Sequence, residues 1–262
     1  MTPAAVGEAA RILAQARLGG PPTAGLDAAP ATVADGYALQ RALHAVLEAA
    51  GRGPRSGHKI GCTTKVMQAY LGVDHPCAGE VFAGTVHATG AEVPLARFHR
   101  VGVECEVAAR LGADLPARDG GHDRDSVAAA VDCLMAGIEL VDDRYADYRT
   151  LPAPVLIADD FFNAGVVLGI AVPDWRGLDL AAIEGVMTID GEEAGRGRGA
   201  DILGHPLNAL AWLADQRAAA GTPLRAGEFV MLGSVVKTVW LDAPAVVAVR
   251  FEGLGEASVA FT

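Results

Sequence analysis

The most informative stretch of the sequence is R-V-G-V-E-C-E-V-A-A-R-L, residues 100–111. It is long and apolar, which is typical of a strand in the body of a sheet. Side chains at alternate positions of a strand point to the same face, so Glu104 and Glu106 project together while Val103, Cys105 and Val107 project to the other face. The stretch therefore predicts a strand with a pair of carboxylates on one side.

The carboxylate pair points to a metal site. Two adjacent carboxylates repel each other, and burial of either one without a partner costs several kcal/mol. A divalent cation removes both penalties, and Mg²⁺ or Mn²⁺ prefers oxygen ligands. Glu139, a single acid within the apolar run M-A-G-I-E-L-V-D-D (135–143), is a candidate third ligand. The alternative is that Glu104 and Glu106 lie on a solvent-exposed face and Glu139 forms a salt bridge.

Lys59 is the second candidate for chemistry. It lies in S-G-H-K-I-G-C-T-T (56–64), where it precedes Ile-Gly in an apolar strand. Lysine is rarely buried without a reason, so Lys59 is expected to pair with a substrate carboxylate or to supply a proton. The alternative is an exposed lysine on the strand. His58 alternates to the other face and is expected to be structural.

The remaining pattern predicts an α+β protein. Apolar residues at helical spacing predict helices over 4–17, 32–50, 64–71 and 205–220. Segments rich in Val, Ile and Ala between Gly and Pro turns predict strands over 57–61, 80–87, 101–111, 134–142, 163–170, 185–190, 228–231 and 245–251. We therefore expect a helical N-terminal region, residues 1–75, packed on a β-rich body, residues 76–262, with mostly antiparallel sheets or a barrel-like roll.

Composition excludes several classes of partner. The 262 residues are 51% hydrophobic and carry a net charge of −11, with no block of basic residues. Binding to nucleic acid or to an anionic membrane requires clustered Lys and Arg, so neither partner is expected. The longest stretches without a charged residue, 161–173 and 202–214, have 13 residues each. A membrane-spanning helix needs about 20.

The N-terminus and the cysteines indicate where the protein is located. The N-terminus has neither a basic start nor a sustained apolar run, and the four cysteines are scattered, so we expect a cytoplasmic protein with reduced thiols.

Two motifs do not indicate the function that they suggest at first. The run G-R-G-R-G-A (195–200) formally matches a dinucleotide motif, but the next residues do not open a helix, and a flexible turn is expected. Ser234 lies outside a G-x-S-x-G elbow, which argues against a serine hydrolase.

Five motifs in order resemble one known family. They are GHKIGCTTKVMQAYLGVDHPCAG (57–79), VECEVAARLGADLP (103–116), AGIELVDDRYADYR (136–149), IADDFFNAGVVLG (157–169) and LGHPLNALAWLA (203–214). They resemble 2-keto-4-pentenoate hydratases and the related 2-oxohept-3-ene-1,7-dioate hydratases and 4-oxalocrotonate decarboxylases of the fumarylacetoacetate hydrolase superfamily. The resemblance spans about residues 35–255. It implies a small helical N-terminal part followed by a mixed-sheet roll of the fumarylacetoacetate hydrolase C-terminal type.

The resemblance also implies roles for the acids and the lysine. The family's metal-binding E-x-E falls on Glu104 and Glu106, its third ligand falls on Glu139, and its K-I-G lysine falls on Lys59. A bound Mg²⁺ or Mn²⁺ would chelate the carboxylate and 2-oxygen of a small 2-oxo or 2-hydroxydienoic acid. Lys59 is then expected to pair with the carboxylate or to deliver a proton at the distal carbon.

Two departures from the family pattern affect the substrate pocket. Cys77, in D-H-P-C-A-G, stands where many hydratases have an acid, so it is a catalytic candidate, and Asp74 or His75 is an alternative source of the base. The family's A-D-N-A-S-S-G becomes A-D-D-F-F-N-A-G, in which Asp159 and Phe162 are expected to contact substrate. Ser234 is expected to do the same. The two phenylalanines predict a more apolar pocket, suited to an alkyl or aryl tail.

The resemblance implies a metal-dependent lyase. The expected reaction hydrates a 2-hydroxy-2,4-dienoate to a 4-hydroxy-2-oxo acid during aromatic meta-cleavage catabolism, in a homo-oligomer. Alternatives are a 4-oxalocrotonate-type decarboxylase, which would use the same enolate, and a C–C bond hydrolase of the same superfamily. A non-catalytic partner of a related hydratase or decarboxylase is a further alternative, although a scaffold has no need for three clustered carboxylates and a lysine.

Overall fold

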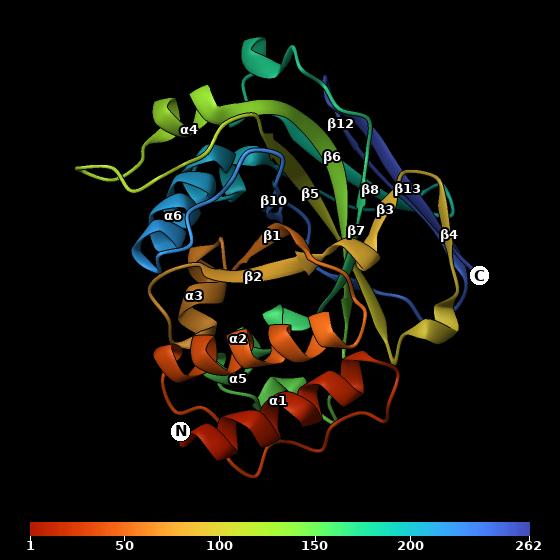
Figure 1. Ribbon diagram of the computed structural model, residues 1–262. Coiled ribbons are helices and arrows are strands. Elements are labelled where there is room, and N and C mark those ends of the chain that lie inside the picture. Colours follow the sequence, from red (N-terminus) through yellow and green to blue (C-terminus); the bar gives the residue numbers. More distant parts are fainter.

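Strand β5 (Val101–Leu111) runs through the middle of the structure, a computed structural model that describes all 262 residues (Figure 1). It pairs along its whole length with the antiparallel strand β6 (Val131–Asp142). On its other edge it pairs with β10 (Phe229–Ser234) and β11 (Val239–Trp240). Nearly all of β5 is buried, and the apolar stretch that contains Glu104 and Glu106 therefore forms the centre of the larger sheet.

The strands form two sheets. The larger mixed sheet has the order β2-β1-β10-β5-β6-β7-β3, with β11 beside β5, and the smaller has the order β4-β13-β12-β8-β9. Their other strands are β1 (Arg55–Gly61), β2 (Cys77–Phe82), β3 (Val86–Ala88), β4 (Ala91–Val93), β7 (Asn163–Leu168), β8 (Glu184–Ile189), β9 (Glu192–Arg198), β12 (Ala245–Phe251) and β13 (Gly255–Phe261). Most pairs are antiparallel, but β1–β10, β3–β7 and β4–β13 are parallel.

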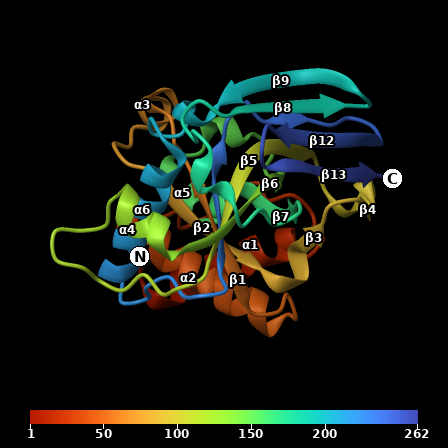
Figure 2. The same cartoon turned by 90° about the horizontal axis from the view of Figure 1, so that it is seen from above.

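The two sheets pack face to face around the main core. Seen from above, β8, β9, β12 and β13 form a separate layer beside the larger sheet (Figure 2). Val103, Cys105 and Val107 on β5 point into the core of 42 buried residues that the two layers share. Alternate residues of β5 therefore point away from the smaller sheet, and Ala108 belongs to a separate apolar cluster.

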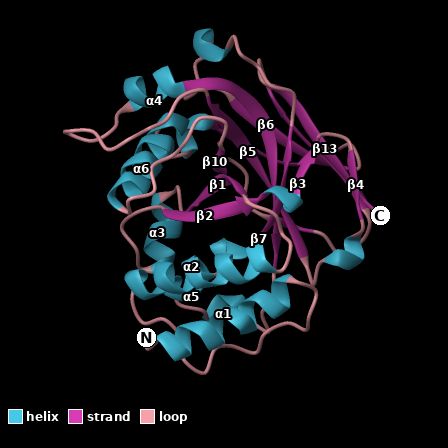
Figure 3. Cartoon of the chain, viewed as in Figure 1, coloured by secondary structure: helices cyan, strands magenta, loops and turns pink.

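Six helices cover the edges and one end of the sheets (Figure 3). They are α1 (Pro3–Arg17), α2 (Val33–Ala49), α3 (Lys65–Leu71), α4 (Arg124–Ala130), α5 (Ala153–Ala158) and α6 (Pro206–Ala219). Thr2, Thr32 and Thr64 cap the first three by accepting a hydrogen bond from the backbone of the first turn. Helices α1, α2 and α5 form a second apolar core with the end of β2. None of the six is long and apolar enough to cross a membrane.

The predicted α+β class and mixed-sheet roll are confirmed, and the predicted helices and strands lie within a few residues of those observed. The division at residue 75 stays a prediction. Strand β1 precedes that boundary and lies inside the larger sheet, between β2 and β10. Four strands were not expected, namely β4, β9, β11 and β13.

The prediction of a flexible turn over residues 195–200 was wrong. Strand β9 extends to Arg198 and pairs with β8. Gly195 and Gly197 permit this because they have no Cβ. A Cβ at Gly195 would lie 2.5 Å from the side chain of Val236, and a Cβ at Gly197 would lie 1.9 Å from the carbonyl oxygen of Val235. The glycines thus mark a close backbone approach within a strand rather than a hinge.

Gly36 gives a test of the helical layer. A Cβ at this position of α2 would lie 2.6 Å from the carbonyl oxygen of Pro154 on α5. We expect Gly36→Ala to lower the free energy of unfolding by about 2 kcal/mol, although alanine has the higher helix propensity by about 1 kcal/mol. Gly7→Ala in α1 is the matched control because nothing lies within 4 Å of its added Cβ. Urea unfolding should show the control equal to or more stable than wild type, and equal stability of both variants would contradict the close packing.

Candidate active site

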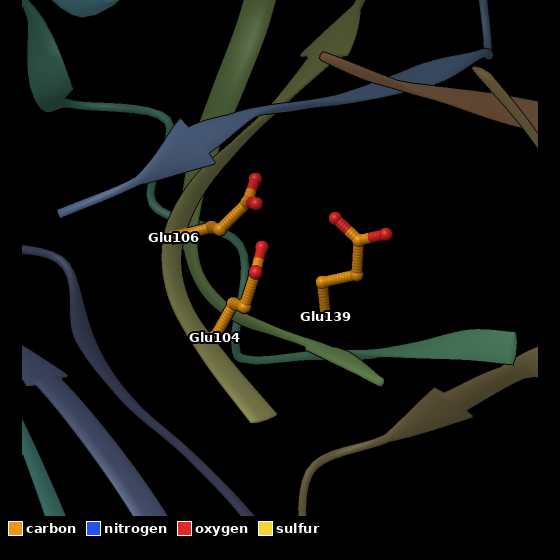
Figure 4. Close-up of side chains that lie close together, drawn as sticks. All are labelled: Glu104, Glu106 and Glu139. Carbon is orange, nitrogen blue, oxygen red and sulfur yellow. The ribbon is translucent and has the colours of Figure 1, made fainter. Parts of the chain in front are cut away.

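Three glutamates meet on one face of the larger sheet. Glu104 lies directly opposite Glu139 in the β5–β6 ladder, and Glu106 follows two residues along the same face of β5. One carboxylate oxygen from each lies within 4.8 Å of the other two (Figure 4). Glu139 and Glu106 are 0% and 1% exposed. Like charges directly opposite each other destabilise a strand pair, so this arrangement is costly without a cation.

Each glutamate accepts a hydrogen bond from a different part of the chain. The hydroxyl of Thr238 donates to Glu104. The backbone N–H of Gly233 donates to Glu106 Oε2 at 2.9 Å, and the side-chain amide of Asn163 donates to Glu139 Oε1 at 2.9 Å. Glu139 Oε2 is buried with no partner. The triad therefore presents fixed oxygen donors, one of them unsatisfied, which fits a hard divalent cation.

Lys59 lies beside the triad. It projects from β1, is 3% exposed, and places Nζ 3.2 Å from Glu139 Oε1. Burial disfavours its charged form, but the attraction of the three glutamates outweighs burial and raises the pKa of Lys59. Nζ also lies 5.8 Å from the centre of the Phe161 ring. The lysine is a buried cation and not the exposed strand residue of the alternative interpretation.

One lysine does not neutralise three glutamates. Burial and the negative charges of Glu139 and Glu104 raise the pKa of Glu106 well above its usual range. Burial also raises the pKa of Glu139 to about 7, although Lys59 opposes the shift. The raised pKa values mean that ionising all three acids costs free energy in the folded chain. A bound divalent cation would remove that cost.

Cys77 is buried and lies at the start of β2, paired with Gly61 on β1. A hydrogen bond with the Cys62 thiol, together with burial, raises the pKa of Cys77. A thiol that stays protonated is a poor general base. His75, the alternative, bonds through Nδ1 to the carbonyl oxygen of Pro76 at 2.7 Å and stacks on Trp212. A catalytic role for Cys77 stays a prediction, and its thiol does not replace the missing acid as a base.

Asp159 and Phe162 point into the helical layer instead of toward the triad. Asp159 is 1% exposed and accepts hydrogen bonds from Arg144 at 3.0 Å and the Tyr145 hydroxyl at 3.2 Å. Phe162 packs edge-on against the rings of Tyr145 and Tyr148. Their roles in substrate binding stay predictions, but both side chains have a structural partner set of their own.

Phe161, rather than Phe162, is the aromatic side chain next to Lys59. The reason is backbone geometry, because Asp160, Phe161 and Phe162 have φ values of 50°, 49° and 69°. Three consecutive non-glycine residues in the left-handed region are rare and strained. Arg17 and His44 hold the turn by bonding to the Asp160 carboxylate at 2.6 and 2.9 Å.

Ser234 ends β10 opposite Glu106 in the strand register. Its hydroxyl donates to the carbonyl oxygen of Val236 at 2.6 Å and accepts from the N–H of Cys105 at 3.0 Å. The hydroxyl thereby stabilises the irregular pairing of β10 with β5 that also brings the Gly233 N–H to Glu106. Substrate contact by Ser234 is likewise still a prediction. His58 is structural as expected, bonded to Glu228 at 3.3 Å.

Three contributors to the site were not predicted from the sequence, namely Asn163, Gly233 and Thr238. Phe161 was expected, together with Phe162, to make the pocket more apolar. Asn163 lies inside a quoted motif but had no signal that distinguished it from its neighbours. Gly233 and Thr238 contribute through a backbone amide and a hydroxyl whose position depends on how the chain turns after β10. No residue pattern reports that turn.

Comparison with known proteins agrees with this geometry. Residues 66–261 match the family model described as fumarylacetoacetate (FAA) hydrolase C-terminal. The chain is 39% identical over 206 residues to a 2-keto-4-pentenoate hydratase of Burkholderia vietnamiensis, covering 79% of this chain and 78% of that protein. It is 35% identical over 263 residues to a 2-keto-4-pentenoate hydratase of Paraburkholderia xenovorans, covering 100% of this chain and 96% of that one.

Among solved structures, the chain is similar to 4-oxalocrotonate decarboxylase from Pseudomonas putida G7, complexed with magnesium and adipate. The TM-score is 0.90 at 27% identity, over 100% of this chain and 99% of that one. The likeness thus extends over both the helical layer and the two sheets.

Glu106→Gln tests the electrostatic strain of the triad in the presence of a chelator. Because the folded chain raises the pKa of Glu106, wild type loses stability as pH rises above the unfolded value of about 4.3. The variant lacks this loss, so at pH 7 its free energy of unfolding should be higher by about 1 kcal/mol or more.

The stability difference between wild type and Glu106→Gln should widen from pH 5 to pH 7 in chemical unfolding with EDTA. Glu252→Gln, at an exposed glutamate in the turn between β12 and β13, is the matched control and should leave stability unchanged. A Glu106→Gln variant that is less stable than wild type under chelation would show that the triad is not strained.

Proposed function

The chain belongs to the fumarylacetoacetate hydrolase family, and we propose that it is a metal-dependent hydratase of 2-hydroxy-2,4-dienoates. The observation that carries the proposal is the group formed by buried Glu106 and Glu139 and half-buried Glu104, with Lys59 against it. These four residues stand at the positions that the resemblance assigns to the family's metal ligands and lysine. Identity of 35% over the whole chain to a 2-keto-4-pentenoate hydratase supports the same reaction class.

The three glutamates would hold Mg²⁺ or Mn²⁺. Support comes from the all-oxygen donor set, the orphaned Glu139 Oε2 and the magnesium named for the similar decarboxylase structure. When bound, the cation would supply a Lewis acid for the carboxylate and 2-oxygen of the substrate, stabilising the enolate. The hydrogen bonds from Thr238, Gly233 and Asn163 would fix the orientation of the carboxylates.

Lys59 would hold the reacting acid in place. Hydration of the dienoate protonates the distal carbon C5, which leaves a 2-oxo-3-enoate, and water then adds at C4 to give 4-hydroxy-2-oxopentanoate. The Lys59 ammonium would pair with the substrate carboxylate or deliver the C5 proton, as a cation fixed beside Glu139. Phe161 would form an apolar wall there, which favours a vinyl or alkyl tail over a second carboxylate.

A decarboxylase of the 4-oxalocrotonate type is the second candidate. It is favoured by the TM-score of 0.90 to such an enzyme over the full chain. Both reactions would pass through an enolate of the same 2-oxo acid, so the triad and Lys59 suit either one. The substrate's second carboxylate separates them, because the decarboxylase releases it as CO₂.

Three finer expectations belong to the same proposal. We propose a homo-oligomer, as the family resemblance implies, and a cytoplasmic location, with which four free and buried cysteines are compatible. The division into a helical region, 1–75, and a catalytic body, 76–262, is proposed as a description of roles. Gel filtration with light scattering would test the first of these directly.

The activity test uses purified protein, Mg²⁺ and freshly prepared 2-hydroxypenta-2,4-dienoate. We expect loss of the dienoate absorbance and a product heavier by one water, abolished by EDTA and restored by Mg²⁺ or Mn²⁺. Glu106→Gln should lose both turnover and the Mg²⁺-dependent rise in melting temperature, whereas Glu252→Gln should keep both. Release of CO₂ from 4-oxalocrotonate without hydration of the dienoate would replace the proposal with the decarboxylase.

Lys59→Met separates the lysine from the metal. The variant should keep the Mg²⁺-dependent rise in melting temperature but lose about 100-fold or more in kcat/KM, because the cation beside the substrate is gone. Lys65→Met, at an exposed position of α3, is the control. Wild-type turnover in Lys59→Met would remove Lys59 from the mechanism.

A further inference from the structure

Four arginines converge on a cavity at the outer edge of the larger sheet. The cavity has a volume of about 40 Å³ and lies between the end of α1, the loop before β1, and strands β3 and β7. Arg17, Arg52, Arg97 and Arg144 all line it, and Asp142 is the single acidic residue among the lining side chains. So many cations around so few anions is an unusual composition for a partly buried pocket.

Two of the arginines are neutralised by the ion network beneath the cavity. Arg17 lies 2.6 Å from the Asp160 carboxylate. Arg144 lies 3.0 Å from Asp159 and 3.9 Å from Asp142. These pairs tie α1 and the segment after β6 to the strained turn at Asp160, and they account for the nearby acids.

The other two arginines have no carboxylate partner. Arg52 donates to the main-chain carbonyl oxygen of Arg17, and neither Arg52 nor Arg97 lies in any ion pair of the structure. Burial and the positive charges of the three other arginines lower the pKa of Arg52. Four arginines against Asp142, Asp159 and Asp160 leave an excess of one positive charge in the cavity and the ion network beneath it.

A third observation points to a missing ligand. Arg144 is 2% exposed, yet its Nε is buried with no hydrogen-bond partner. Nearly all buried polar side-chain atoms in folded proteins are bonded to protein or to an ordered group. An unsatisfied guanidinium nitrogen on the wall of a cationic cavity is what a bound anion would satisfy.

We propose that this arginine pocket is a binding site for a small oxyanion with two negative charges, of which inorganic phosphate is the representative. Arginine binds such ions through paired, charge-assisted N–H bonds, and Arg52 and Arg97 offer two guanidinium groups that no carboxylate neutralises. At about 10–15 Å³ for each water-sized group, the cavity holds about three such groups, the size of a tetrahedral oxyanion and too small for a nucleotide.

The pocket is separate from the carboxylate triad but adjacent to it. The main-chain carbonyl of Asn163 accepts from Arg17 at 3.0 Å and Arg144 at 3.3 Å, while its side-chain amide donates to Glu139 at 2.9 Å. The two sites thus lie on opposite sides of one residue, with opposite charge. A phosphate that bound at a metal in the triad would require divalent cation, whereas binding in the arginine pocket would not.

Isothermal titration with inorganic phosphate tests the proposal. The full chain is titrated with and without Mg²⁺ present, the latter in EDTA, with chloride at equal ionic strength as the control ion. We expect saturable phosphate binding at millimolar concentration or below that persists in EDTA and has no counterpart with chloride. Arg52→Gln combined with Arg97→Gln should weaken it about tenfold or more.

Two further variants keep the test decisive. Arg97→Gln alone alters an exposed side chain and should fold normally while weakening phosphate binding, and Arg250→Gln on β12 should leave binding unchanged. Binding that disappears in EDTA, or that is equal in the double variant and wild type, would overturn the proposal. A third outcome would also overturn the proposal. If wild type binds no phosphate and the double variant dissociates into smaller species in light scattering, the arginines form a subunit contact.

Discussion

Three carboxylates, two of them buried and one half-buried, repel one another on one face of the larger sheet. Pairing of β5 with β6 sets Glu104 against Glu139, and the pleat adds Glu106 to the same face. Nothing in the local strand chemistry favours this, because each acid would be more stable in water. The surrounding elements offset the cost in part by aiming three hydrogen-bond donors and one ammonium group at the acids. The repulsion that remains would favour the binding of a cation.

The sequence was sufficient for the parts of this arrangement that depend on alternation and composition. The spacing of Glu104 and Glu106 placed both on one strand face, and Glu139 and Lys59 stood out as charges in apolar runs. Their gathering in one place rested on the family resemblance, since periodicity says nothing about which strands are neighbours. Helices α1, α2, α3 and α6 were predictable because apolar spacing is a local signal, whereas the short helices α4 and α5 were not expected.

What could not be predicted depends on backbone paths between elements. The choice of Phe161 over Phe162 beside Lys59 follows from three successive left-handed residues, for which these residue types have no propensity. Arg17 and His44, which lie far away in the sequence, stabilise that turn by hydrogen bonds to the Asp160 carboxylate. The helical layer is therefore part of the site's construction, because it sets the strained turn that presents Phe161. In the same way, the first four residues of G-R-G-R-G-A end strand β9, where the two glycines leave room for Val235 and Val236.

The parallel pairing of β1 with β10 has a consequence for how the chain folds. Gly57 and Lys59 find their ladder partners at Phe229 and Met231, near the other end of the sequence. Contacts of such long sequence separation form slowly, since the intervening chain must be ordered before they are gained. During synthesis on the ribosome, β5 and β6 can associate before β10 is made, when the strand that carries Lys59 has β2 as a neighbour but lacks β10. A chain synthesised only as far as β6 therefore contains the three acids and Lys59 but not β10, the strand that joins the lysine strand to β5.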